Sequence, residues 1–156
     1  MIRFAPNFLA WVAFVFAGSV HAAELVKVVD PWSRATVPGQ SVGGVYMDLV
    51  ASEPLRLVAI RTAAAETAEV HQMKMEKGMM RMRAVPFLAL PAGKTVKLRP
   101  GGYHVMLFDL KNSLVEGQKL KLELVVEDAA KIQHRIPVEA LIRDRDAGMA
   151  SGHDMH

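Results

Sequence analysis

The chain has 156 residues, of which 51% are apolar and 22% are charged, as in an ordinary globular domain. Its formal net charge of +3 at pH 7 is too small to indicate nucleic-acid binding. It contains ten methionines and no cysteine, which excludes disulfides, cysteine nucleophiles, thiolate metal sites and a lipid anchor on cysteine.

The first segment has the pattern of a secretory signal peptide. Arg3 supplies a positive charge, and residues 8–17 form an apolar run shorter than the ~20 residues of a membrane-spanning helix. Val20-His21-Ala22 resembles a small-x-small cleavage sequence. We therefore predict a signal peptide over residues 1–22, export to the periplasm, and no membrane span after cleavage.

Residues 23–140 are predicted to form one all-β domain, because short β-rich runs alternate with Gly and Pro. Pro31 is expected to end the first strand, and Ala and Glu make a helix the alternative for residues 62–68. Strand number and spacing favour a Greek-key β-sandwich or barrel. The predicted strands are 25–30, 44–51, 55–63, 68–76, 79–85, 94–98, 103–110, 119–126 and 132–138.

Methionines are concentrated around a predicted hairpin. Lys77-Gly78 suits a two-residue loop between two strands, and residues of equal parity in a strand share a face. His71 then lies diagonally from Met82, within reach of long side chains. The register predicts that Met73 faces Met82 and that Met75 faces Met80.

A second pair of candidate ligands lies in the predicted strand 103–110. His104 and Met106 are two residues apart and therefore share a face. Thioether sulfur is a soft, neutral ligand that suits copper(I) better than zinc, magnesium or calcium. For other His and Met residues we favour a role without metal. His134 is then a structural or surface residue, and four methionines are core or flanking residues: Met73, Met75, Met79 and Met80.

The spacing His71-x10-Met82-x21-His104-x-Met106 resembles the ligand signature of the periplasmic copper chaperones called PCu(A)C. Further similarity lies at 32–36, 43–47, 90–93 and 100–104 and extends over residues 24–138. The resemblance implies a cupredoxin-like β-barrel that binds one copper(I) through these four side chains. It also implies delivery of copper to cytochrome c oxidase assembly, often beside a Sco-type thiol protein.

Residues 141–156 are predicted to form a flexible tail, because they carry mixed charge and little apolar surface. Two interpretations of the tail stay open. One is chance composition, and the other is a weak second site, because the tail resembles a short version of the Met/His-rich extensions with which some PCu(A)C relatives bind extra copper, often copper(II). The candidate ligands there are Met149, His153, Met155 and His156.

Two other functions compete with copper delivery. The first is periplasmic copper buffering or resistance, in which the methionines hold metal without passing it on. The second is catalysis, which we do not expect, because the sequence has no suggestive carboxylate pair, Ser/His/Asp arrangement or phosphate-binding loop.

Overall fold

The computed structural model describes residues 24–147, which form ten β-strands and no helix. This confirms the predicted all-β class. Within the described range, no helix is long and apolar enough to span a bilayer. The predicted signal peptide and the four candidate ligands of the tail lie outside the described residues. The strands are β1 (Val26–Arg34), β2 (Val42–Ala51), β3 (Leu55–Arg61), β4 (Ala65–Glu76), β5 (Met79–Ala84), β6 (Leu88–Leu90), β7 (Thr95–Leu98), β8 (Tyr103–Leu110), β9 (Lys119–Glu127) and β10 (Gln133–Arg143).

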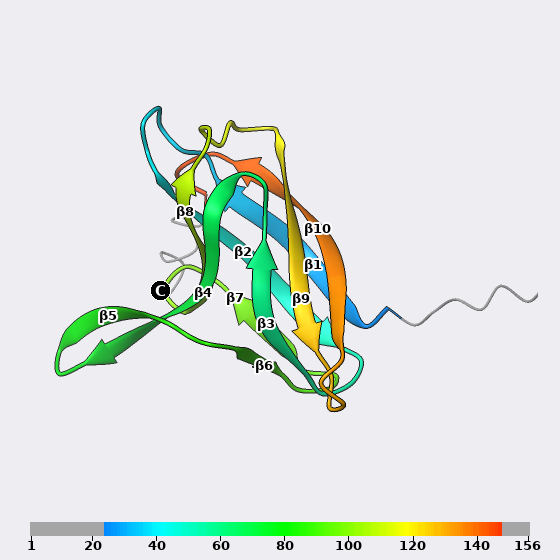
Figure 1. The fold of residues 1–156 in the computed structure, drawn as a ribbon. Helices are drawn as coiled ribbons and strands as arrows, with labels where there is room; N and C mark the ends of the chain where they lie inside the picture. Colours follow the sequence, from blue (N-terminus) through cyan, green and yellow to red (C-terminus); the bar gives the residue numbers. More distant parts are fainter. Residues whose placement is uncertain (1–23, 148–156) are drawn as a thin grey trace, which may run out of the picture.

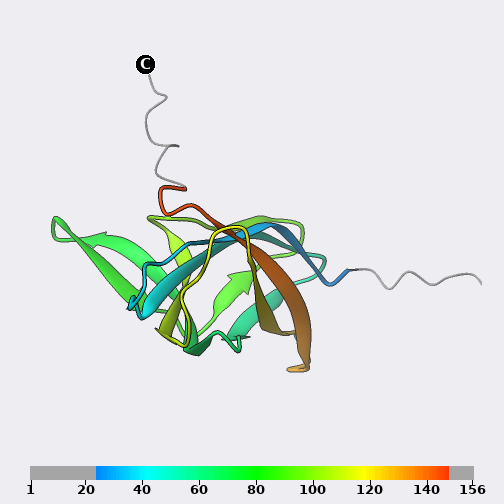
Figure 2. The same ribbon diagram turned by 90° about the horizontal axis from the view of Figure 1, so that it is seen from above.

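All ten strands belong to one curled sheet in the order β5-β4-β8-β7-β2-β1-β10-β9-β3-β6, and β8 also pairs with β2 (Figures 1 and 2). β1 and β10 run parallel, whereas most other neighbours are antiparallel. β3 and β4 follow each other in the chain but are not hydrogen-bonded neighbours in this order. Residues of both strands line a cleft of about 440 Å³.

The core lies inside the curl of the sheet, on one face of each strand. In β9, Leu120, Leu122 and Leu124 are buried and alternate with lysines and a glutamate, as the period of a half-buried strand requires. In β8, Val105 and Leu107 are fully buried. Because side chains alternate along β8, His104 and Met106 lie on the opposite, outward face.

The hairpin of β4 and β5 has the predicted loop and register. Lys77 and Gly78 both have positive φ, 50° and 76°, as a type I′ turn requires. Met73 pairs with Met82 and Met75 with Met80, which confirms the predicted register. The hairpin projects beyond the rest of the sheet (Figure 1), so its outer half has no second layer of structure against it.

The prediction that Pro31 ends the first strand is wrong, because β1 continues to Arg34. The pairing with β2 shifts between Val29 and Trp32, and Asp30 has a φ of 48°. Asp30 and Pro31 therefore form a β-bulge, where a proline is tolerated because its position need not donate to the ladder.

Two other boundaries differ from the predictions. The helical alternative for residues 62–68 is wrong, since β4 begins at Ala65 and pairs with β8. Tertiary pairing outweighs the helix propensity of Ala and Glu here. β10 continues to Arg143, three residues beyond the expected domain boundary, because Leu141 pairs with Trp32 of β1.

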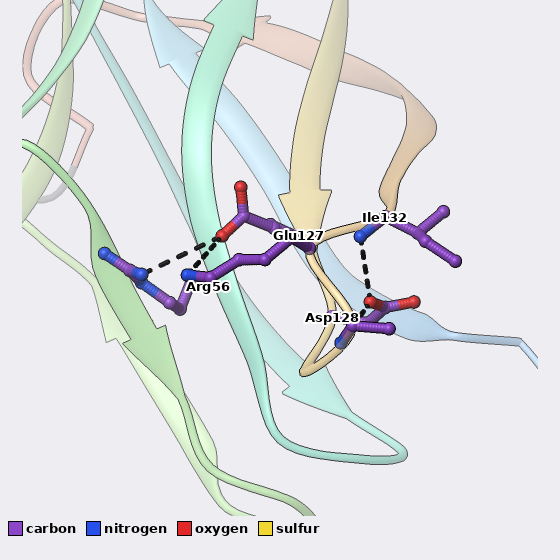
Figure 3. A network of polar contacts seen from close by, with 6 residues as sticks. Arg56, Glu127, Asp128 and Ile132 are labelled. Atoms are coloured by element: carbon purple, nitrogen blue, oxygen red, sulfur yellow. Dashed lines mark hydrogen bonds and ion pairs between the residues drawn. The ribbon is translucent and has the colours of Figure 1, made fainter.

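The turn between β9 and β10 is organised by one carboxylate, which Figure 3 shows. Asp128 accepts hydrogen bonds from the backbone N–H groups of Ala130 and Ile132. Its other oxygen lies 2.9 Å from His134 Nε2. These bonds lower the pKa of Asp128, and the side-chain bond from His134 has the largest effect. His134 is thus a structural residue of this turn, as the sequence suggested.

Candidate metal centre

His71 and His104 face each other on neighbouring strands. They are direct partners in the antiparallel pairing of β4 with β8. Their ring centroids are 6.3 Å apart, with the planes tilted by 38°. Two imidazoles at this separation can turn toward a common ion between them. The sequence placed each histidine on a strand, but only the pairing of the strands brings the two together.

His104 is held with one nitrogen free. The side chain is buried, and its Nδ1 lies 3.0 Å from the carbonyl oxygen of Gly102. Because a carbonyl can only accept, Nδ1 carries the proton and Nε2 keeps its lone pair. The same carbonyl accepts the backbone N–H of Met73 at 3.1 Å. The loop before β8 therefore fixes both the tautomer and the orientation of His104.

His71 has the complementary arrangement. Its Nε2 lies 3.0 Å from a carboxylate oxygen of Glu69, so Nε2 carries the proton. Its Nδ1 is buried and has no hydrogen-bond partner. A buried nitrogen without a partner costs free energy unless something binds its lone pair. Metal-binding histidines usually donate their second nitrogen to a carboxylate or carbonyl, as His71 and His104 both do.

Met106 lies on β8 opposite Glu69 of β4, two residues along from the pair of His71 and His104. The His71 ring is 6.3 Å from the ring of His104 and 5.5 Å from the ring of Phe108. Met106 is the residue between these two on the same face of β8, and it is half-buried. In the pairing of β8 with β2, Met106 is opposite Gly44.

Tyr46 packs over Gly44 at the edge of this site. A Cβ placed on Gly44 would lie 2.7 Å from the Tyr46 hydroxyl, so any larger residue would displace the Tyr46 ring. The Tyr46 ring also packs on Trp32 at 4.5 Å, and burial raises the pKa of its hydroxyl. Trp32, Gly44 and Tyr46 belong to the motifs at 32–36 and 43–47, and Gly44 and Tyr46 line one pocket together with Met106.

Met82 is less closely placed than the other three candidates. It lies on β5 opposite Met73, diagonal to His71, and its side chain is 44% exposed. In a flat sheet, Met82 and Met106 would have Cα atoms about 16 Å apart, two strands and four residues away from each other. His71 lies between the two methionines, because Met82 on β5 and Met106 on β8 are each one strand and two residues away from it.

Of the core or flanking roles considered for the four hairpin methionines, the core role is wrong for Met75, Met79 and Met80. Met75, Met79 and Met80 are 59%, 56% and 51% exposed, and Met73 is half-buried. The physical reason is the projection of the hairpin, which leaves no layer to cover either of its faces. Sequence reasoning also missed Glu69 and Phe108. Glu69 is two residues from His71 and therefore shares its face of the strand, and this spacing was the signal by which the sequence could have indicated the contact.

The donor atoms limit the type of metal. Across residues 24–147, no three His, Cys, Asp or Glu side chains are grouped so that they could hold an ion. A site at His71 and His104 would therefore have to be completed by the thioethers around them. Two imidazoles with thioether sulfurs favour copper(I) over the harder divalent ions.

Solved structures show the class of domain to which this chain is similar. The copper-bound PCuAC domain from PmoF2 has 25% identity and a TM-score of 0.64, over 80% of this chain and 97% of that one. The copper(I) form of DR1885 from Deinococcus radiodurans has 26% identity and a TM-score of 0.56, over 79% and 83%. The chain is thus an all-β domain with the PCuAC-like fold.

Sequence comparison then identifies the family. Residues 26–138 match the family described as "Putative lipoprotein LpqE-like". "Putative lipoprotein Lxx21020" of Leifsonia xyli is 30% identical over 75% of this chain and 71% of its own length. Uncharacterized protein RP573 of Rickettsia prowazekii is 29% identical over 69% of this chain, but only 62% of that relative is covered. The chain belongs to the LpqE-like family.

Proposed function

We propose that this protein is a periplasmic copper(I) carrier that binds one ion through His71, Met82, His104 and Met106. The observation that carries the proposal is the facing histidine pair, in which each ring has one nitrogen bonded and the other free. Similarity to copper-bound PCuAC domains supports the choice of metal.

Release follows from the chemistry of the ligands. Thioethers and neutral imidazoles hold copper(I) without negative charge, so a thiolate acceptor binds the ion more strongly. The site lies at the outward face of β4 and β8, where a partner can bind the metal before all of the ligands have dissociated from it. We propose that the copper passes by ligand exchange to the assembly of cytochrome c oxidase, either at its copper site or through a Sco-type thiol protein.

Copper(I) titration against a competing chelator tests the ligand set. We expect one tightly bound ion, weaker binding in the double variant Met82→Leu/Met106→Leu, and loss of tight binding in His104→Ala. His134→Ala is the matched control, because His134 lies in the β9–β10 turn and bonds Asp128. Unchanged affinity in the double methionine variant would refute the four-ligand site.

A second experiment separates delivery from buffering. Deletion of the gene should lower cytochrome oxidase activity when copper is scarce, and the His104→Ala variant should fail to restore it. If deletion instead causes sensitivity to excess copper with normal oxidase activity, the buffering function is correct and delivery is not.

A further inference from the structure

The outer half of the β4–β5 hairpin carries thioethers that the proposed four-ligand site leaves unused. Met73, Met75, Met80 and Met82 lie on one face of the hairpin, as two directly facing pairs. The described residues expose ten large apolar side chains, and four of these are methionines of this hairpin. No core contact accounts for Met75 and Met80, since both are more than half exposed.

The two pairs continue the line of the histidines. Along β4, His71, Met73 and Met75 follow each other at steps of two residues, about 6.6 Å per step. Directly facing residues have Cβ atoms about 4.5–5.5 Å apart, so two flexible methionine side chains can converge on one ion. The Met75–Met80 pair therefore lies one step beyond the Met73–Met82 pair, which itself lies one step beyond His71.

The charges of the hairpin also separate by face. Lys74, Arg81 and Arg83 have the other parity, and the two arginines lie 3.9 and 2.8 Å from Glu76. The thioether face of the hairpin is consequently free of charged side chains, while the cationic side chains lie on the opposite face. Such surroundings suit a singly charged soft ion bound by neutral sulfur, and they make its binding weaker than at the histidines.

We propose that Met75 and Met80, with Met73, form a second and weaker copper(I) site that loads the histidine site. The identity of the ion rests on the proposed function. Bonds from copper to Met75, Met80 and Met73 break as bonds to Met82 and then to His71, His104 and Met106 form. The ion stays copper(I) throughout, and no proton is released, because thioethers carry none.

Methionine-methyl NMR of the full chain resolves the two sites. In an anaerobic copper(I) titration, the first equivalent should shift the methyl signals of Met82 and Met106. The second should shift those of Met75, Met80 and Met73. Met79 has the opposite parity and should stay unshifted. The double variant Met75→Leu/Met80→Leu should lose the second step, keep the affinity of the first site, and load more slowly from a copper(I)–chelator complex. Met79→Leu is the matched control.

Two results distinguish failure here from failure of the proposed function. If Met75 and Met80 do not shift at two or more equivalents, or if only the methionines of residues 148–156 respond, the hairpin site is refuted. If Met75 and Met80 shift while Met82 and Met106 do not, the hairpin site stands and the four-ligand site fails. Because leucine preserves the size and apolar character of methionine, the variants should fold, which the unshifted core methyl of Met47 would verify.

Discussion

Different partners fix the two facing histidines, and the difference has consequences for substitution. The ring of His104 is bonded to a backbone carbonyl, which no side-chain change removes. The ring of His71 is bonded to the carboxylate of Glu69, which is 45% exposed. Glu69 is therefore a positioning residue that a single mutation can test.

Glu69→Ala should weaken copper(I) binding by about 10- to 100-fold, the usual effect of removing a carboxylate that orients a metal-binding histidine. Glu69→Gln should lose less copper(I) affinity, because the amide oxygen still accepts a hydrogen bond from His71 Nε2. Stability should change little, since the carboxylate is largely in solvent. The measurement is a chelator-competition titration beside urea unfolding, with Glu66→Gln as control. Equal loss in both Glu69 variants would argue against the orienting bond.

At the scale of elements, the proposed site joins the β4–β5 hairpin to the body of the sheet. Met82 belongs to the hairpin, whereas Met106 lies in the body of the sheet on β8. A shared ion would draw β5 toward β8. The tip of the hairpin lies in open space, since a Cβ on Gly78 would contact nothing within 4 Å.

Hairpin closure can be measured with dyes, since the absence of native cysteine allows clean labelling. With short-range donor and acceptor dyes at Lys74→Cys and Lys111→Cys, copper(I) should increase energy transfer. The same addition to a labelled Met82→Leu protein should give a smaller increase. Transfer that stays constant while the Met82 methyl signal shifts would show that the ion reaches Met82 without closure.

The β9–β10 turn gives a pH dependence with a definite sign. The folded-state pKa of Asp128 is lowered, first of all by the bond from His134. Its contribution to stability is therefore present above the pKa of the unfolded state, near 4, and is lost as pH falls through the lower folded value. Asp128→Asn should thus be less stable than wild type at neutral pH. The difference in stability between the two proteins should become smaller below pH 4. Urea midpoints between pH 7 and pH 2.5 measure it, and a gap that widens in acid would contradict the assignment.

For the whole molecule, the core and the proposed site are separate. Of the four proposed ligands, only His104 is buried, and the largest fully buried side chains belong to the inner face of the sheet. The metal-free protein should consequently be folded, which distinguishes it from domains that need a structural metal. At the same time, the four proposed ligands come from three strands, β4, β5 and β8, which are neighbours only in the folded state.

Copper(I) should therefore raise the melting temperature without being needed for folding. Free ion at about 100 times Kd adds about 2.7 kcal/mol of stability if it binds only the native state. Thermal unfolding followed by circular dichroism should show one transition in the presence of a strong chelator and a higher one with copper(I). His104→Ala should remove the increase. Unfolding by the chelator alone would mean that the metal is structural.

The sequence by itself determined the features that depend on near neighbours. Alternation predicted most of the strands, and Lys77-Gly78 predicted the hairpin register, because a two-residue loop leaves one pairing for the strands that flank it. The spacing of the four candidate ligands could likewise be recognised in the sequence without knowledge of the fold. Pro31 misled the prediction because a bulge depends on the partner strand, which local patterns do not reveal.

Only the tertiary structure decided what depends on residues far apart in the chain. The pairing of β4 with β8 sets His71 opposite His104, although the two residues are 33 positions apart in the chain. The exposure of Met75 and Met80 follows from where the sheet ends, because a strand pattern reports which side chains share a face and not what covers that face.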